Sequence, residues 1–164
     1  MKTYALALAA TLASIAVAPQ AIAAADEPQL QRLALCQNSW LESKNDDVRM
    51  KRFANFFETR FDQSAEGDAF TPKSPIKVLG HDATRVYPQS VGMGVGFSVL
   101  IDAGFTEARA NVERQLGKSM TCATSEGVRS CEVELGAKKT VVLMTGQSGA
   151  AKTSLVGCFY FYQQ

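Results

Sequence analysis

Four cysteines constrain this chain more than any other feature, because a disulfide decides which segments must meet. Cys122 and Cys131 flank the segment ATSEGVRS. If its central dipeptide, EG, forms a two-residue hairpin loop, Cys122 faces Cys131 at a non-hydrogen-bonded position. The Cα atoms lie closest at such positions, and their separation suits a disulfide. Of the three possible connectivities, the sequence therefore favours this pair, and elimination pairs Cys36 with Cys158.

The N-terminus has the pattern of a secretory signal peptide. An apolar, alanine-rich run follows Lys2 and ends in small residues, with possible cleavage after Ala23 or Ala25. The run is too short to span a bilayer stably. We predict a signal peptide over residues 1–25 and a single soluble domain over residues 26–164, exported to the periplasm without membrane insertion after signal cleavage.

Export would place the cysteines in an oxidising compartment, where disulfides persist. A zinc site is the alternative use of cysteine, but the chain has no C-x-x-C motif and one histidine, His81. Loss of Lys2 with the signal leaves 16 of the 17 Lys and Arg residues against 16 Asp and Glu. This balance gives no general affinity for nucleic acid. We expect no metal and no other cofactor.

Apolar residues at helical spacing predict two N-terminal helices, over residues 28–43 and 47–62. Residues 63–75 are polar and contain glycine and proline, which predicts a surface loop. A third helix is expected over residues 107–116, with Thr106 as its N-cap and a glycine after its last residue.

Alternation of period two predicts strands in the rest of the chain. The stretch SVGMGVGFSVLID, residues 90–102, is the longest and places Gly92, Gly94 and Gly96 on one face. Glycine costs entropy in a strand, so this face implies close packing of a helix, a sharply curved sheet, or a flat bed for a ligand. The other predicted strands cover residues 76–79, 84–87, 118–124, 128–135, 139–145 and 153–162.

These elements together predict an α+β domain. Two N-terminal helices precede an antiparallel β-meander, one inserted helix packs on the sheet, and two disulfides brace it. The helix-then-meander half is similar in layout to cystatin-like and β-lactamase-inhibitor-like domains. That resemblance concerns architecture and does not transfer a function.

The segment MTGQSGAAKTSL contains fragments of two catalytic or nucleotide-binding motifs. A phosphate-binding loop needs glycine directly before lysine and a helix after it, whereas Ala151 precedes Lys152 and a strand follows. A nucleophile elbow on Ser148 would need glycine where Ala150 stands. The one histidine, His81, is expected in a solvated hairpin turn. We therefore expect neither nucleotide binding nor serine hydrolase chemistry.

Carboxylates offer the remaining route to catalysis. Glu132 and Glu134 share one face of a predicted strand, and Asp102 and Glu107 flank a predicted turn. A glycosidase needs two carboxylates that face each other across a cleft, whereas a shared strand face is expected to be solvated. We predict no catalytic residues, and we keep a small carboxylate-dependent hydrolase as an alternative.

An exported, disulfide-braced domain without a catalytic constellation is typical of binding proteins. We predict a non-catalytic, protein-binding protein, most concretely a periplasmic inhibitor or immunity protein that neutralises a secreted or envelope-acting toxin or hydrolase. A structural or adaptor factor of an envelope or secretion assembly is the alternative. The residues expected to contact the partner lie in the loop before the last strand and on that strand: Gln147, Ser148, Lys152, Tyr160 and Tyr162.

Overall fold

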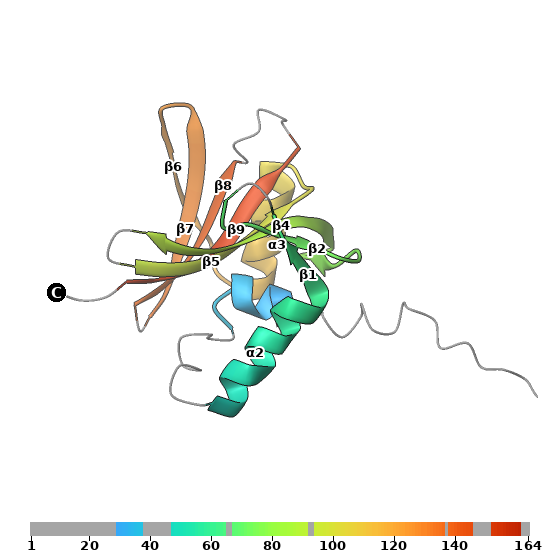
Figure 1. The fold of residues 1–164 in the computed structure, drawn as a ribbon. Helices are drawn as coiled ribbons and strands as arrows, with labels where there is room; N and C mark the ends of the chain where they lie inside the picture. The colour runs from blue at the N-terminus through green and yellow to red at the C-terminus, as the bar shows by residue number, and fades with distance from the viewer. Residues whose placement is uncertain are drawn as a thin grey trace, which may run out of the picture.

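The computed structural model describes residues 29–37, 47–64, 67–91, 94–136, 138–145 and 152–161. Helices and an antiparallel sheet make up this part of the chain, and two disulfides link it (Figure 1). The predicted signal peptide lies outside the described residues. The α and β elements mix as expected, but several of them begin, end or pair differently.

Three helical segments are described. Residues 29–34 are helical, α2 spans Asp47–Arg60, and α3 spans Phe105–Leu116. The bounds of α2 lie close to the predicted ones. Residues 38–46, which include the end predicted for the first helix, lie outside the described residues.

The first helix ends well before the predicted position 43, because Cys36 takes a left-handed backbone conformation, with a φ of 58°. The N–H of Gln37 donates to the carbonyl of Arg32 at 2.8 Å, and the N–H of Cys36 donates to that of Leu33 at 3.3 Å. This pair of bonds is a Schellman motif, which satisfies the last carbonyls of a helix and reverses the chain. Apolar spacing alone did not reveal this stop, since it falls on a cysteine rather than on a glycine.

The N-cap of α3 is Gly104, and not Thr106 as predicted. Gly104 has an extended backbone, and its carbonyl accepts the N–H of Ala108 at 2.9 Å, which places Thr106 inside the first turn. Gly117 ends the helix in the left-handed conformation, with a φ of 62°. The glycine stop was therefore predicted correctly and the cap was not.

The sheet is antiparallel in every described pairing. Its strands follow the order β1-β2-β4-β5-β9-β8-β7-β6, and β3 pairs with β4. The predicted meander is present from β6 to β9, but β9 lies between β5 and β8, so β5 and β6 are not neighbours. The strands are β1 Phe61–Gln63, β2 Phe70–Pro72, β3 Lys77–Val78, β4 His81–Val91, β5 Gly94–Ile101, β6 Thr121–Ser125, β7 Val128–Gly136, β8 Lys139–Thr145 and β9 Ser154–Phe161.

Two segments differ from their predicted form. The stretch 63–75 contains most of the β1–β2 hairpin rather than only a loop. The stretch 90–102 is divided between two strands, because β4 ends at Val91 and β5 begins at Gly94, and these two residues are partners across the hairpin. Glycine disfavours a strand interior and favours a turn, which accounts for a reversal in this glycine-rich sequence.

The hairpin of β3 and β4 is tighter than predicted. Leu79 and Gly80 both have positive φ, at 57° and 85°, which is the signature of a two-residue type I′ turn. Strand β4 therefore begins at His81, and the histidine lies in a strand rather than in a turn. The strand predicted over residues 84–87 continues through Pro88, which lies beside Phe97 of β5. On the edge of β4 that faces away from β5, no described residue pairs with Pro88. The N–H that proline lacks would point to this edge, so its absence removes no hydrogen bond between strands.

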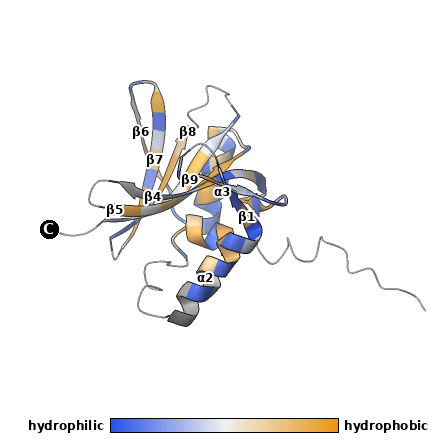
Figure 2. Cartoon of the chain, in the orientation of Figure 1, coloured by the Kyte–Doolittle hydropathy of each residue, from blue (hydrophilic) through white to orange (hydrophobic). Residues whose placement is uncertain are grey.

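One face of the sheet carries the core and the helices. Phe97 of β5 is 1% exposed, and the ring of Phe57 from α2 lies 5.8 Å from it. The neighbouring residue on β9 is Cys158, whose disulfide to Cys36 attaches the first helix to the same face. Helix α3 lies against β8 with Val112 fully buried. Hydrophobic and hydrophilic residues alternate along β7, as a strand with one covered face requires (Figure 2).

The glycine face of β5 is filled by an aromatic ring. A Cβ added to Gly96 would overlap the ring of Phe159, which lies directly opposite on β9. A Cβ added to Gly157 would lie 2.6 Å from that of Ser98. Close packing was thus the right reason for Gly96, but the packed group is a side chain of the next strand and not a helix.

Candidate functional site

The β6–β7 hairpin has the predicted alignment at every position from Ser125–Val128 to Cys122–Cys131. The loop residues Glu126 and Gly127 have φ values of 51° and 80°, which are those of a type I′ turn. Cys122 and Cys131 form a disulfide with a Cα–Cα distance of 4.0 Å, and Cys36 and Cys158 form the second with 5.0 Å. The pairing in the structure is the one that the sequence favoured.

This hairpin projects from the body of the molecule (Figure 1). All five residues of β6 are exposed. At the tip, Val128 is 43% exposed, and it is the large hydrophobic side chain that stands out in solvent within the described ranges. The disulfide ties the two strands together below this tip. The result is a braced hairpin that presents an apolar residue.

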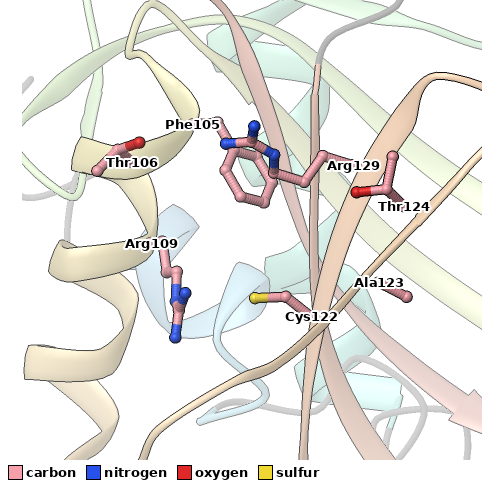
Figure 3. A pocket seen from close by; sticks show the side chains of 7 residues that line it. All are labelled: Phe105, Thr106, Arg109, Cys122, Ala123, Thr124 and Arg129. Atoms are coloured by element: carbon pink, nitrogen blue, oxygen red, sulfur yellow. The ribbon is translucent and has the colours of Figure 1, made fainter.

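A cleft of about 320 Å³ lies between the hairpin and the first turns of α3 (Figure 3). A second hollow adjoins it at the N-terminus of α3 and is bordered by Glu107. The first cleft is lined mainly by basic, aromatic and hydroxyl-bearing residues, together with a disulfide cysteine and an alanine. The lining residues are Phe105, Thr106, Arg109, Cys122, Ala123, Thr124 and Arg129.

Arg129 is the prominent cation of this cleft. Its Cζ lies 5.2 Å from the centre of the Phe105 ring, and Figure 3 shows the guanidinium across the face of that ring. A guanidinium over an aromatic face gains a cation–π interaction. Within the part of the chain that the structure describes, no carboxylate forms an ion pair with Arg129. Its N–H donors are therefore available to a ligand.

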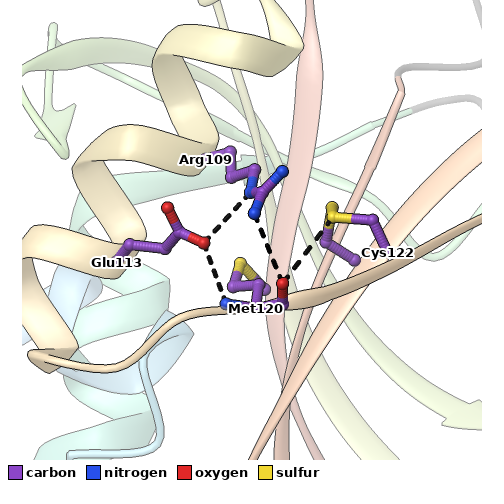
Figure 4. Close-up of a disulfide and its surroundings, with 5 residues drawn as sticks. Arg109, Glu113, Met120 and Cys122 are labelled. Atoms are coloured by element: carbon purple, nitrogen blue, oxygen red, sulfur yellow. Dashed lines mark hydrogen bonds and ion pairs between the residues drawn. A yellow bond between two sulfur atoms is a disulfide. The ribbon is translucent and has the colours of Figure 1, made fainter.

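Arg109 is engaged in a network that joins α3 to β6 (Figure 4). Its Nε donates to Oε1 of Glu113 at 3.0 Å, and its Nη2 donates to the carbonyl of Met120 at 3.4 Å. The same Glu113 oxygen accepts the N–H of Met120 at 2.8 Å. The Met120 amide, and then Arg109, lower the pKa of Glu113 below its ordinary value of 4.5. This network holds the cleft wall in place.

His81 lies next to α3. Its Nε2 is 3.1 Å from Nδ2 of Asn111 and 3.6 Å from Oε1 of Glu107. Asn111 Nδ2 is a donor that also donates to the carbonyl of Leu79, and its contact with His81 is a hydrogen bond in the tautomer whose Nε2 carries no hydrogen. The neighbouring Asp82 instead pairs with a lysine. The described contacts of His81 include no hydroxyl or thiol nucleophile.

The predicted carboxylates do not form a pair across a cleft. Glu132 and Glu134 are exposed on β7, on the side opposite the buried Cys131. Asp102 is exposed beyond β5, and Glu107 is exposed on α3, with its Oε1 3.6 Å from Nε2 of His81. Within the described ranges, no group of three or more His, Cys, Asp or Glu side chains is arranged to hold a metal ion.

Two of the residues predicted to contact a partner, Lys152 and Tyr160, lie in the described ranges. Gln147, Ser148 and Tyr162 lie outside the described residues. Lys152 is exposed in a turn before β9. Tyr160 is 8% exposed and belongs to the core, so burial withholds its ring from a partner.

The sequence did contain a signal for Arg129 that was overlooked. Arg129 is two residues from Cys131, so both side chains lie on the same face of β7. Because Cys131 is paired and buried, Arg129 must point toward the face that the helices cover. A positively charged side chain on that face is unusual unless it binds a partner. Val128 and Phe105 gave no such local signal.

Comparisons with protein-family models, with the curated proteins and with the solved structures found no match. No helix in the described ranges has both the length and the apolar composition needed to cross a membrane. The geometry of the hairpin and its cleft therefore carries the functional interpretation.

Proposed function

We propose that this chain is an exported, non-catalytic, protein-binding protein that contacts its partner with the β6–β7 hairpin. One observation carries the proposal: a disulfide-braced hairpin projects from the sheet and exposes Val128 at its tip. A preformed element loses little conformational freedom on binding, and an exposed apolar side chain supplies area to bury. The loop before β9 was predicted as a contact; its residues 146–151 lie outside the described residues, so that contact stays a prediction.

The most concrete form of this function is a periplasmic inhibitor or immunity protein that neutralises a secreted or envelope-acting toxin or hydrolase. A narrow, rigid hairpin suits entry into the cleft of such an enzyme. The two disulfides support an exported chain, because disulfides persist in oxidising compartments. In this proposal the two N-terminal helices form part of the scaffold on the core side of the sheet.

The test is affinity capture on the immobilised, disulfide-intact protein from a periplasmic extract of the producing cells. We expect wild type to retain one hydrolase or toxin and to inhibit it stoichiometrically. Val128→Asp places a charge on the contact and should reduce retention about tenfold or more. Asp68→Asn, an exposed change in the turn between β1 and β2, serves as the matched control and should retain the enzyme fully.

Other outcomes separate the alternatives. Equal retention by wild type and Val128→Asp would exclude the hairpin as the contact. Retention of a multi-protein envelope complex with no enzyme in it would favour the adaptor function. Turnover by the protein itself, lost on substitution of His81, Glu132 or Glu134, would favour the hydrolase.

A further inference from the structure

We infer that the cleft beside the hairpin binds one carboxylate group, with Arg129 as its main ligand. The inference deepens the proposed function and rests on it, since the partner would present this group. Its basis is the arrangement of Arg129, Phe105, Thr106 and Thr124 around one cleft of about 320 Å³.

The position of Arg129 over Phe105 prepares the guanidinium for an anion. Its Cζ lies 5.2 Å from the centre of the ring, and no carboxylate of the described residues forms an ion pair with it. Two parallel N–H groups of an arginine match the two oxygens of a carboxylate. Because the ring already restricts the side chain, less freedom is lost when the carboxylate binds. The hydroxyls of Thr106 and Thr124 border the same space and add donors.

The charge balance of the cleft favours a single negative charge. Arg109 is neutralised by Glu113 and bonded to the carbonyl of Met120. Glu107 borders the adjoining hollow and adds a negative charge on that side. Arg129 is therefore the cation that remains for a ligand, and it balances one charge. A phosphate dianion would bring a second charge that Glu107 repels, so we assign a carboxylate.

The wall of the cleft also indicates what accompanies the carboxylate. Phe105 provides apolar surface beside Arg129, which suits the methylene groups of an acidic side chain or the last side chain of a polypeptide. The carboxylate can belong to an acidic side chain or to the C-terminus of a polypeptide. The experiment uses one probe for each source, so that their affinities can be compared.

The experiment is a ¹H–¹⁵N NMR titration of the disulfide-intact protein with four probes. N-acetylphenylalanine mimics a chain terminus, and N-acetylglutamic acid α-amide mimics an acidic side chain. N-acetylphenylalanine amide is the neutral control, and inorganic phosphate is the competing anion. We expect both carboxylates to give saturable shifts at Phe105, Thr106, Thr124 and Arg129, and the neutral amide to give none. The tighter of the two carboxylate probes identifies the source.

Variants test the role of the guanidinium. Arg129→Gln should weaken carboxylate binding about tenfold, as expected for loss of a charge-assisted bidentate contact. Arg129→Lys keeps the charge without the fork and should weaken it less. Arg114→Gln, an exposed change in the last turn of α3, is the matched control and should bind as wild type does. The dispersion of each spectrum shows that the variant is folded.

Three results would refute the inference: no saturable shift with either carboxylate, undiminished binding by folded Arg129→Gln, or tighter binding of phosphate than of both carboxylates. None of these requires the protein partner. A failed titration with partner capture still sensitive to Val128→Asp would remove the carboxylate site alone. Carboxylate binding without any captured partner would remove the proposed function alone.

Discussion

At the scale of single residues, Gly96 shows how a side chain on one strand can dictate the residue on the next. The ring of Phe159 occupies the space that a Cβ of residue 96 would need. We expect Gly96→Ala to lower the free energy of unfolding by about 1–3 kcal/mol through overpacking. Chemical denaturation measures this change.

A second glycine provides the matched control for that substitution. Gly104 has no atom within 4 Å of its ideal Cβ position and does not have a positive φ. Gly104→Ala replaces a favoured N-cap residue but meets no neighbouring atom, so it should cost less than Gly96→Ala. Replacing Phe159 with leucine should recover part of the loss in the double variant Gly96→Ala/Phe159→Leu. Equal costs for the two glycine substitutions would contradict the packing explanation.

Residue-scale prediction from sequence worked where geometry was local. The alternation of β7 and the two-residue loop sufficed to place Cys122 opposite Cys131. Prediction from sequence failed at Cys36, where a cysteine in the left-handed conformation ends a helix. Hydrogen bonds and a disulfide to a strand distant in sequence hold this conformation. Prediction also failed for Phe105, which meets Arg129 only through tertiary packing.

At the scale of elements, Glu113 connects α3 to the start of β6 and makes this junction dependent on pH. The folded state lowers its pKa, so the ionised form is favoured by folding. The resulting stability is present above pH 4.5 and is lost as pH falls through the lowered pKa. Glu113→Gln should be less stable than wild type at pH 7, and the difference should shrink in acid. Denaturation at several pH values tests this, and a constant difference would contradict it.

The boundaries and neighbours of the strands were only partly predictable. Residues 128–136 and 139–145 had local patterns that decided their extent. The reversal between Val91 and Gly94 did not, since alternating apolar residues occur on both sides of it. The position of β9 beside β5 depends on contacts between residues some sixty positions apart, such as Gly96 with Phe159, and local spacing does not encode them.

At the scale of the whole molecule, the two disulfides contribute different amounts to the free energy of unfolding. Cys36 and Cys158 are separated by 122 positions, whereas Cys122 and Cys131 are separated by 9. A cross-link restricts the unfolded chain more when it closes a longer loop. We expect Cys36→Ala/Cys158→Ala to cost about 4–5 kcal/mol of unfolding free energy and Cys122→Ala/Cys131→Ala about 2–3 kcal/mol.

Thermal and chemical unfolding of both double variants measures this order. Hydrogen exchange adds a spatial readout: loss of the hairpin disulfide should speed exchange in β6 and β7 and leave α2 unchanged. Loss of the long-range disulfide should instead speed exchange in the first helix and β9. A larger cost for the hairpin pair would contradict the chain-entropy argument.

The place of β9 has a consequence for when the sheet can form. Of the described strands β9 comes last in the sequence, yet it lies between β5 and β8 and joins the two halves. Until it is available, β4–β5 and β6–β8 remain separate fragments with open edges. The two fragments can therefore join into one sheet only after β9 has been synthesised. A chain with this strand order has no continuous sheet, and so no complete core, before its last described strand is available.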